Sequence, residues 1–349
     1  MDRGKAIIYK AVIRPLLFSL PAERASKLGE LALRAPGFWG ALRSVQPVPD
    51  ERLRATVAGL EFPSPAGAAA GLDKDCKFLG PLLALGFGFA TGGTVTLSAR
   101  PGNPKPRLVR DVPRRAVVNA MGFPGAGLDE AERRLRSLAA HRARLLASVS
   151  GTIEEEVLEC HARLQPLVAA VEVNISSPNT AELRIFHEPA RLRALVEALA
   201  RVKDRPLFVK LPPWPRDAEA RRTALMLAET AVNAGADGFV VANTHPVEDE
   251  RLKVGRGGLS GAPIFEHTVR MVAEARAALP RAAIIGCGGV FSARDVWELM
   301  SVGADAVQLY TALVYEGPGL PGRVNRDLLA MMEKTGAKSV REISGRPPD

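Results

Sequence analysis

Cysteine is scarce in this 349-residue chain, and the three that occur, Cys76, Cys160 and Cys287, lie far apart. An odd number of widely spaced cysteines builds neither a disulfide framework nor a typical zinc site. The sequence therefore predicts no metal centre and favours a reducing compartment. Cys287 stands in the stretch IIGCGG, where we expect a small buried apolar side chain.

Long apolar runs and the common nucleotide motifs are also missing. No window of about 18 uncharged apolar residues exists, so we expect no membrane-spanning helix. The N-terminus has no small-residue cleavage site behind an apolar run, which argues against a secretory signal. Neither a dinucleotide fingerprint nor a P-loop stands between a strand and a helix, which disfavours NAD and ATP as bound cofactors.

Positive charge is in excess, with a formal net charge of +9. Such an excess suits nucleic acid, an anionic membrane surface or anionic small molecules, so its distribution must decide. On a helical wheel of the first 45 residues, Arg3, Lys10 and Arg14 share one side. The opposite side is apolar and holds Ile8, Val12 and Leu16. Lys5 and Pro15 interrupt the pattern.

A second helical pattern, AERASKLGELALRA, follows Pro21. Two hypotheses are open for this helical pair. One is a hairpin packed on the main domain. The other is a pair of helices lying in a membrane interface, with the basic side toward anionic lipid.

Eight short apolar segments with the pattern of strands alternate with helical stretches from residue 66 onward. They are AGAAAGL, GFATGGTVT, RLLASVS, AAVEVNIS, PLFVKLPP, GFVVANT, AAIIGCGG and AVQLYTA. Eight βα units predict an α/β fold, a (β/α)8 TIM barrel with residues 97–123 inserted after the second strand. The alternative is a doubly wound open sheet. We predict two parts, an N-terminal helical segment over 1–45 and the barrel over 46–349.

Polar residues and glycines gather where the predicted strands end, which in a parallel barrel is the end that carries the active site. They are Gly71, Asp73 and Lys74; Thr94 and Thr96; Asn174, Ser177 and Asn179; Lys210; Asn243 and Thr244; Gly288 and Gly289; Tyr310 and Thr311. A single amide or hydroxyl after a strand is usually a turn or cap residue. Agreement among seven of the eight predicted strands points instead to one polar site.

A phosphate site is predicted after the last two strands, where a barrel typically holds one. The GCGG stretch exposes backbone N–H groups, and a helix beginning near Ser292 would add its dipole. A glycine-rich turn, GGLSG at 257–261, lies just before. Lys210 would place a cation beside a ring that gains negative charge on reduction, as a flavin does. The alternative for Lys210 is a pairing with a neighbouring carboxylate.

These stretches together resemble the flavin-dependent dihydroorotate dehydrogenases, specifically the quinone-linked class 2. The resemblance is carried by AAGLDKD at 69–75, PGNPKPRLVR at 101–110, NAMGF at 119–123, NISSPNT at 174–180, ANT at 242–244, GGLSG at 257–261 and QLYTALVYEGP at 308–318. It implies a barrel holding FMN, dihydroorotate or orotate stacked on the flavin, a quinone as electron acceptor, and a place in pyrimidine biosynthesis, with no nucleic acid partner. It also implies peripheral attachment through the N-terminal helices, on the cytoplasmic side of the cell (inner) membrane.

The resemblance also implies the binding residues. Those for the substrate are Lys74, Asn119, Met121, Gly122, Phe123, Asn174, Asn179, Asn243 and Thr244. Asparagine amides offer both donors and acceptors to a flat pyrimidine acid, and Lys74 supplies the positive charge. Those for the flavin are Ala69, Ala70, Gly71, Thr94, Asn119, Asn174, Lys210, Gly261, Gly288, Gly289, Tyr310 and Thr311.

By the same resemblance, Ser177 is the base that takes a proton from carbon 5 while carbon 6 passes a hydride to the flavin. A serine there resembles class 2, whereas class 1 has a cysteine. A serine hydroxyl is a weak base, so the site must carry its proton away. Thr180 and Phe123 resemble the water-relay and lid positions of the family. The alternative for Ser177 is a turn residue before Pro178.

Arg110 resembles an arginine that faces a quinone tunnel between the helices and the barrel; the alternative is a surface cation paired in a turn. For His187 we expect a surface or cap position. The class 2 pattern is not complete. Ala120 stands where class 2 usually has an arginine, with GFPGAG in place of GFNN, and Ser148 stands where class 2 has an asparagine that touches flavin, as in class 1.

Two other functions are open from the sequence. A flavin barrel of the same superfamily could act on another pyrimidine or on tRNA uridine, and the basic charge would suit RNA. A non-catalytic flavin-binding or membrane-associated protein is the third hypothesis. The complete set of asparagines favours a free pyrimidine acid as the substrate.

Overall fold

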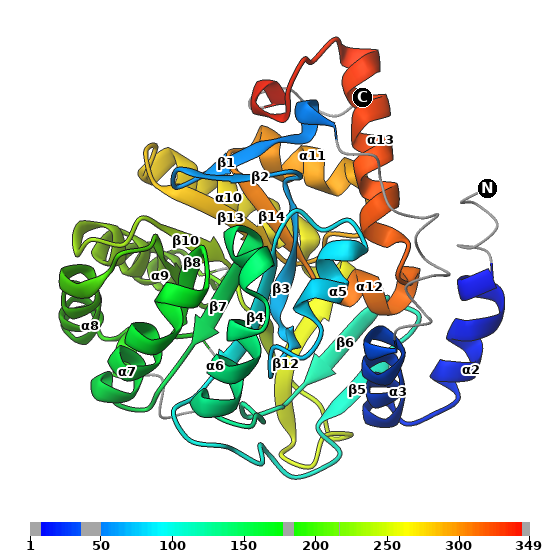
Figure 1. Ribbon diagram of the computed structural model, residues 1–349, viewed down its shortest axis with the longest axis horizontal. Helices are drawn as coiled ribbons and strands as arrows, with labels where there is room; N and C mark the ends of the chain where they lie inside the picture. The colour runs from blue at the N-terminus through cyan, green and yellow to red at the C-terminus, as the bar shows by residue number, and fades with distance from the viewer. Residues whose placement is uncertain (1–7, 36–49, 177–184, 216, 344–349) are drawn as a thin grey trace.

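A closed barrel of eight parallel strands lies at the centre of the computed structural model, which describes residues 8–35, 50–176, 185–215 and 217–343 (Figure 1). The strands are β3 (Ala66–Asp73), β4 (Ala90–Val95), β7 (Leu145–Val149), β8 (Ala170–Asn174), β9 (Leu207–Lys210), β10 (Gly238–Val241), β13 (Ala283–Cys287) and β14 (Ala306–Leu309). They follow one another around the barrel in chain order, and β14 closes it by pairing with β3. All eight predicted strands are confirmed, and the open-sheet alternative is wrong.

Helices surround the barrel on the outside (Figure 1). They are α5 (Leu79–Ala84), α6 (Leu128–Arg136), α7 (Glu154–Leu164), α8 (Pro189–Val202), α9 (Ala218–Asn233), α10 (Phe265–Ala278), α11 (Ala293–Ser301), α12 (Thr311–Glu316) and α13 (Leu320–Thr335). Short 3-10 turns are η3 (Glu51–Leu53), η4 (Ala139–Arg144), η5 (Gln165–Leu167), η7 (Ala262–Ile264) and η8 (Val340–Ile343). In α8 the buried residues Leu192, Leu195, Val196 and Leu199 recur at helical spacing and form the stripe that faces the barrel.

The N-terminal end of the barrel is closed by a hairpin of β1 (Ala55–Val57) and β2 (Leu60–Phe62). Phe62 packs on Phe89 with ring centroids 4.6 Å apart, and both lie in the apolar cluster that fills this end. With one end filled by apolar side chains, polar chemistry is confined to the opposite end, where the strands terminate.

Two excursions at the carboxyl end of the barrel form a separate antiparallel sheet. The insertion predicted over 97–123 contains β5 (Leu108–Asp111) and β6 (Ala116–Asn119). It pairs with β12 (Arg256–Gly261), which pairs with β11 (His245–Glu248). The GGLSG stretch is therefore a strand, and its prediction as a glycine-rich turn was wrong. Gly257 is needed because a Cβ there would lie 2.6 Å from the Asn119 carbonyl oxygen.

Ala120, the residue that departs from the class 2 pattern, is fully buried in this sheet. It packs in a small apolar cluster with Val118 and Leu252. An arginine side chain at this position would have to leave that cluster, so the alanine fits the local packing.

The N-terminal residues form a helical pair beside the barrel, at its right-hand edge in Figure 1. A π-helical turn, η1 (Tyr9–Ile13), continues into α2 (Arg14–Phe18), and α3 (Ala22–Arg34) follows. Within the described ranges, no helix is long and apolar enough to cross a membrane. The predicted boundary at residue 45 lies among residues 36–49, outside the described residues, and stays a prediction.

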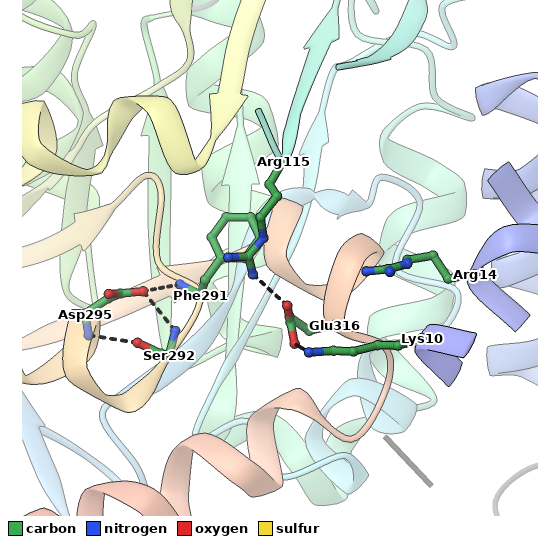
Figure 2. Close-up of a pocket in the computed structure, with 7 residues that line it drawn as sticks. All are labelled: Lys10, Arg14, Arg115, Phe291, Ser292, Asp295 and Glu316. Atoms are coloured by element: carbon green, nitrogen blue, oxygen red, sulfur yellow. Dashed lines mark hydrogen bonds and ion pairs between the residues drawn. The ribbon is translucent and has the colours of Figure 1, made fainter. Parts of the chain in front are cut away.

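Two basic residues of the first helix bond to the protein, although Lys10 stays exposed on one side. Lys10 Nζ lies 2.5 Å from the Glu316 carboxylate (Figure 2). Arg14 donates to the Tyr315 carbonyl oxygen at 3.1 Å. Arg115 reaches the same carboxylate from the barrel side at 2.6 Å. The hypothesis of a basic, lipid-facing side was therefore wrong for Lys10 and Arg14, while Arg3 lies outside the described residues. The physical reason is Glu316, a mostly buried carboxylate that requires cationic partners.

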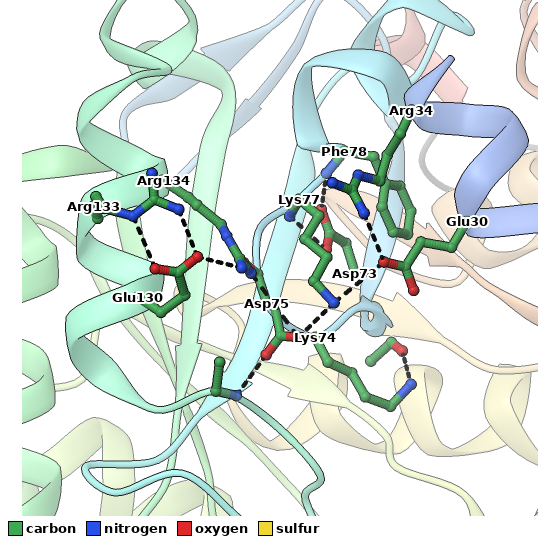
Figure 3. Close-up of polar contacts among 12 residues, drawn as sticks. Glu30, Arg34, Asp73, Lys74, Asp75, Lys77, Phe78, Glu130, Arg133 and Arg134 are labelled. Atoms are coloured by element: carbon green, nitrogen blue, oxygen red, sulfur yellow. Dashed lines mark hydrogen bonds and ion pairs between the residues drawn. The ribbon is translucent and has the colours of Figure 1, made fainter. Parts of the chain in front are cut away.

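The second helix, α3, contacts the turn that follows β3 (Figure 3). Glu30 of α3 lies 3.2 Å from Lys77 Nζ, which lies 2.9 Å from Asp75. Asp75 also accepts a hydrogen bond from the Ala126 backbone N–H at 2.8 Å. The turn is thus held between α3 and the loop that leads to α6.

Asp73 fixes the same turn from inside. Its two carboxylate oxygens accept the backbone N–H groups of Lys77 and Phe78 at 2.8 and 2.6 Å. The side chain is only 1% exposed, and this burial, opposed by the two N–H donors, raises the pKa of Asp73 to about 6.

We expect this carboxyl group to make the protein less stable as pH rises from about 4 to about 6. Over that interval the unfolded chain releases a proton that the native Asp73 retains, so a contribution present below the unfolded pKa of 3.8 is lost as pH passes the folded value. The loss should approach about 3 kcal/mol. Urea unfolding across this interval should show a steeper fall for the wild type than for Asp73→Asn. Parallel curves would contradict the assignment.

Candidate functional site

A chain of hydrogen-bonded polar side chains crosses the mouth of the barrel. Asn174, at the end of β8, donates from Nδ2 to Thr94 Oγ1 of β4 at 3.0 Å, and Thr94 lies 3.1 Å from Ser148 Oγ of β7. Asn243, beyond β10, donates to Ser176 Oγ at 3.0 Å, and Ser176 donates to Asn174 Oδ1 at 2.9 Å. Three predicted site residues, Thr94, Asn174 and Asn243, are therefore brought together from three different strands.

Backbone groups hold these amides in fixed orientations. The Thr244 backbone N–H donates to Asn243 Oδ1 at 2.7 Å, and the Ser176 N–H donates to Asn174 Oδ1 at 3.1 Å. Ser150 Oγ donates to the Asn174 carbonyl oxygen at 2.8 Å. With their oxygens engaged in this way, the two asparagines are positioned before any ligand arrives.

The strand end behind this chain is held by His187. Its Nε2 lies 2.9 Å from the Ile175 carbonyl oxygen. Because a carbonyl oxygen can only accept, this contact requires the tautomer with a proton on Nε2. His187 is partly exposed, and its contact with a backbone carbonyl oxygen agrees with the expected surface or cap position. Ser177, Asn179 and Thr180 lie outside the described residues, so their predicted roles stay predictions.

Lys74 and Asn119 both donate to backbone carbonyl oxygens. Lys74 Nζ donates to the Gly71 carbonyl oxygen at 2.6 Å, which leaves two of its three N–H groups for other acceptors. Asn119 Nδ2 donates to the Gly258 carbonyl oxygen at 3.3 Å. Both residues are partly exposed. Lys74 follows β3 at the barrel mouth, and Asn119 ends β6 of the adjoining sheet.

The predicted substrate loop of Met121, Gly122 and Phe123 is an unusual turn. Gly122 and Phe123 both have positive φ, 67° and 53°. The Met121 carbonyl oxygen accepts the Asn103 backbone N–H at 2.9 Å, and a Cβ on Gly122 would lie 2.5 Å from Asn103 Oδ1. Asn103 of the PGNPKP stretch therefore fixes this turn, a role that the sequence did not predict.

Lys210 is the buried cation of the site. It is 4% exposed, and its Nζ makes two long contacts, each of 3.9 Å, with Cys287 Sγ and with Glu172 Oε1. Burial acts to lower the pKa of Lys210, but the neighbouring Cys287 and Glu172 outweigh it and raise the pKa, so the ammonium remains charged. Lys210 thus has the neighbouring carboxylate that the alternative expected, at a long distance. Its predicted role beside a flavin stays a prediction. Cys287 packs against the apolar cluster of the barrel, as expected, but it is only partly buried and also contacts this cation.

The two glycines after β13 present backbone without side chains at the barrel mouth. Gly288 and Gly289 have φ values of 142° and 76°. A Cβ would lie 2.6 Å from Thr268 Oγ1 at Gly288 and 2.6 Å from the Phe265 backbone at Gly289. Only glycine fits both positions, as a cradle for an anionic group would require.

The predicted helix near Ser292 is confirmed, but its first turn has local partners. Ser292 and Asp295 form a capping box, in which Asp295 N donates to Ser292 Oγ and Ser292 N donates to Asp295 Oδ2 (Figure 2). Asp295 also accepts the Phe291 N–H at 2.7 Å. The expected contribution of this helix end to a phosphate site is therefore weakened, because a carboxylate already occupies it.

The remaining predicted cofactor residues surround the ends of β3 and β14. A Cβ on Gly71, which follows Ala69 and Ala70, would lie 3.5 Å from the Tyr310 ring. Thr311 Oγ1 donates to Ser260 Oγ at 2.8 Å, next to Gly261. A buried cation and a cradle that excludes Cβ atoms fit a cofactor with a ring and an anionic group. Among residues in the described ranges, no group of three or more His, Cys, Asp or Glu is placed to hold a metal ion.

Arg110 joins the inserted sheet to the N-terminal helices. Its guanidinium donates to the carbonyl oxygens of Leu17 and Leu20 and lies 4.6 Å from the centre of the Phe18 ring. Burial lowers its pKa. The alternative of a surface cation paired in a turn was wrong, while the predicted role toward a quinone stays a prediction.

One layer of polar residues inside the barrel was missed from the sequence. Glu172, Gln308 and Thr91 are buried below the mouth. Gln308 Nε2 donates to Thr91 Oγ1 and to Glu172 Oε2, at 3.1 Å each. The signal was present in AAVEVNIS, where a charged residue interrupts a buried strand.

Comparisons with known proteins agree on one family. The family model described as dihydroorotate dehydrogenase matches residues 52–332. A relative from Deinococcus deserti, named dihydroorotate dehydrogenase (quinone), is 37% identical and covers 97% of this chain and 99% of its own. One of the same name from Thermobifida fusca is 36% identical, covering 97% and 96%.

A solved structure is similar over the same extent. It is DHODH from Eimeria tenella in complex with ferulenol, with a TM-score of 0.80 and 28% identity over 93% of this chain and 96% of that one. The family model, the relatives and this shared barrel lead to the same assignment, and the chain belongs to the flavin-dependent dihydroorotate dehydrogenase family.

Proposed function

We propose that this protein oxidises dihydroorotate to orotate through bound FMN and passes the electrons to a quinone, as a step of pyrimidine biosynthesis. The observation that carries the proposal is the pair of amides, Asn174 and Asn243, held by hydroxyl and backbone partners at the barrel mouth. The quinone is supported by relatives named for it that cover almost the whole chain, N-terminal helices included.

The residues of the chain have distinct tasks in this proposal. The amides of Asn174 and Asn243 orient the flat pyrimidine ring, and the Lys74 ammonium binds its carboxylate. Lys210 provides buried positive charge beside the ring system of the cofactor. Bound FMN would supply the acceptor for the hydride that leaves carbon 6, while Ser177 takes the proton from carbon 5.

The direct test uses the purified protein without oxygen. Dihydroorotate should bleach the yellow colour of the bound flavin, and a short-chain quinone should restore it. Bleaching by another pyrimidine but not by dihydroorotate would contradict the proposed substrate, and failure of quinone to restore the colour would contradict the acceptor.

We expect Ser177→Ala to retain FMN and to slow flavin reduction by dihydroorotate at least about 10²-fold, because a general base is lost. Stopped-flow absorbance measures this rate. Ser177→Cys, which keeps a group able to accept the proton, is the matched comparison, and reduction by dithionite checks the cofactor. A near wild-type rate for Ser177→Ala would remove Ser177 from the mechanism.

Lys74→Ala should weaken orotate binding by about 1.5–3 kcal/mol, because an anionic ligand loses its charge-assisted partner. The change in flavin absorbance on titration with orotate gives the affinity. Lys77→Ala is the matched control, since its ammonium faces Glu30 and Asp75. Unchanged affinity in Lys74→Ala would mean that the carboxylate binds elsewhere.

We also propose peripheral attachment to the cytoplasmic side of the cell (inner) membrane through the N-terminal helices. Large exposed apolar side chains gather there: Ile8, Val12, Ile13, Leu16, Leu28 and Leu31. The basic residues Lys10 and Arg14 bond inward, so apolar burial supports the attachment better than charge does. This arrangement reverses the side of the helix that the sequence predicted to meet lipid.

The double substitution Leu16→Glu and Leu31→Glu should therefore reduce vesicle binding and oxidation by a long-chain quinone while sparing a short-chain one. Cosedimentation with neutral vesicles measures the binding, which added salt should barely weaken. Val202→Glu, which changes an exposed apolar residue of α8, is the control. If the double variant binds and reduces long-chain quinone like the wild type, these helices serve packing only.

A further inference from the structure

Glu172 places a carboxylate in the interior of the barrel, one layer below the amides of the mouth. Glu172 and Asn174 are two residues apart on β8, so both side chains point to the same side of the strand. Asn174 pairs in register with Lys210 of β9. The exposed fractions are 0% for Glu172 and 4% for Lys210, so water screens neither charge.

The carboxylate has one neutral and one cationic neighbour. Glu172 Oε2 accepts a hydrogen bond from Gln308 Nε2 at 3.1 Å. Glu172 Oε1 has no hydrogen-bond partner and lies 3.9 Å from Lys210 Nζ. A buried ionised carboxylate is costly unless a cation compensates it, and Lys210 is the cation that the described part of the barrel places against it.

The hydrogen bonding alone does not require a charge at this position. Gln308 could donate equally well to the carbonyl oxygen of a glutamine, which has nearly the same shape. What a glutamine could not supply is negative charge beside Lys210. The feature to be explained is therefore the charge of Glu172.

We propose that Glu172 tunes the flavin through Lys210: by partly neutralising the Lys210 ammonium, it lowers the reduction potential of the bound flavin. The inference rests on the proposed function, in which the flavin lies against Lys210. Reduction adds negative charge to a flavin ring, so a nearby cation favours the reduced state and a nearby anion opposes it. A lower potential favours the later transfer of electrons to the acceptor over the earlier reduction by substrate.

The test is the midpoint potential of flavin in the holoprotein, measured by anaerobic reduction against a reference dye. Glu172→Gln should raise it, with at least a tenfold larger equilibrium constant for two-electron reduction, which corresponds to about 30 mV. Lys210→Met should lower it. Combining both substitutions should return the potential toward the wild-type value, because the two charges are then removed together.

Thr91→Val is the matched control. It removes the other hydrogen bond of Gln308 without changing a charge, so the potential should stay at the wild-type value. If Glu172→Gln does not retain flavin, Glu172→Asp serves instead. Its shorter side chain draws the charge away from Lys210 and should give a smaller rise.

An unchanged or lowered potential in Glu172→Gln, or in Glu172→Asp where that variant replaces it, overturns the inference. A shift of the same size in Thr91→Val also overturns it, because the effect would then come from packing. The proposed function fails separately, through a wild-type flavin that dihydroorotate does not bleach, since the dye measurement needs no substrate. A wild type that binds no flavin would overturn both.

Discussion

The closure of eight parallel strands is the constraint on which the site depends. Because the strands are parallel and in chain order, all their carboxyl ends lie on one rim, and residues far apart in the chain become neighbours there. Thr94 lies near the end of β4, Asn174 is the last residue of β8, and Asn243 follows β10. Their hydrogen bonds to one another, directly or through Ser176, form because these parallel strands end on the same rim.

A second constraint acts through Glu316, the last residue of α12. Glu316 lies beyond the end of β14 and beside the N-terminal helix. Lys10 of that helix and Arg115 of the inserted segment compensate its negative charge. Because Lys10 and Arg14 on the polar side of the helix bond to the protein, the apolar side faces outward. The ion pairs that fix the N-terminal helix to the barrel therefore also leave its apolar side exposed. The attachment of the helix and the apolar surface that it presents have one cause.

The barrel could be predicted from the sequence because its signals are local. Each strand is a short apolar run bounded by glycine or polar residues, and helical patterns separate the runs. What failed depends on partners distant in the chain. The orientation of Lys10 is decided by Glu316, and the strand nature of GGLSG is decided by pairing with β6, about 140 residues earlier.

The site was predictable in part for the same reason. Polar residues at strand ends, Lys74 and Ser177 among them, can be found from periodicity, and the resemblance added the roles expected of these two residues. Asn103, which fixes the turn at Gly122, has no pattern of its own, since its role arises from a close approach of backbone. Glu172 did carry a signal, because a carboxylate inside a buried strand must have a partner, but the strand alone could not identify Lys210 as that partner.

The vertical arrangement of the site separates two physical tasks. At the mouth, neutral amides and hydroxyls can exchange hydrogen bonds between water and a ligand at little electrostatic cost. Lys210 lies level with Asn174, and Glu172 lies one layer below. Both are buried, and there a charge acts over a longer distance because the effective dielectric constant is low. A charge placed at the mouth would bind and release a ligand, but water would screen it when no ligand is bound. In the proposed function, a buried charge acts on the flavin ring whether or not a substrate is bound, so recognition and electrostatic tuning can be changed by different residues.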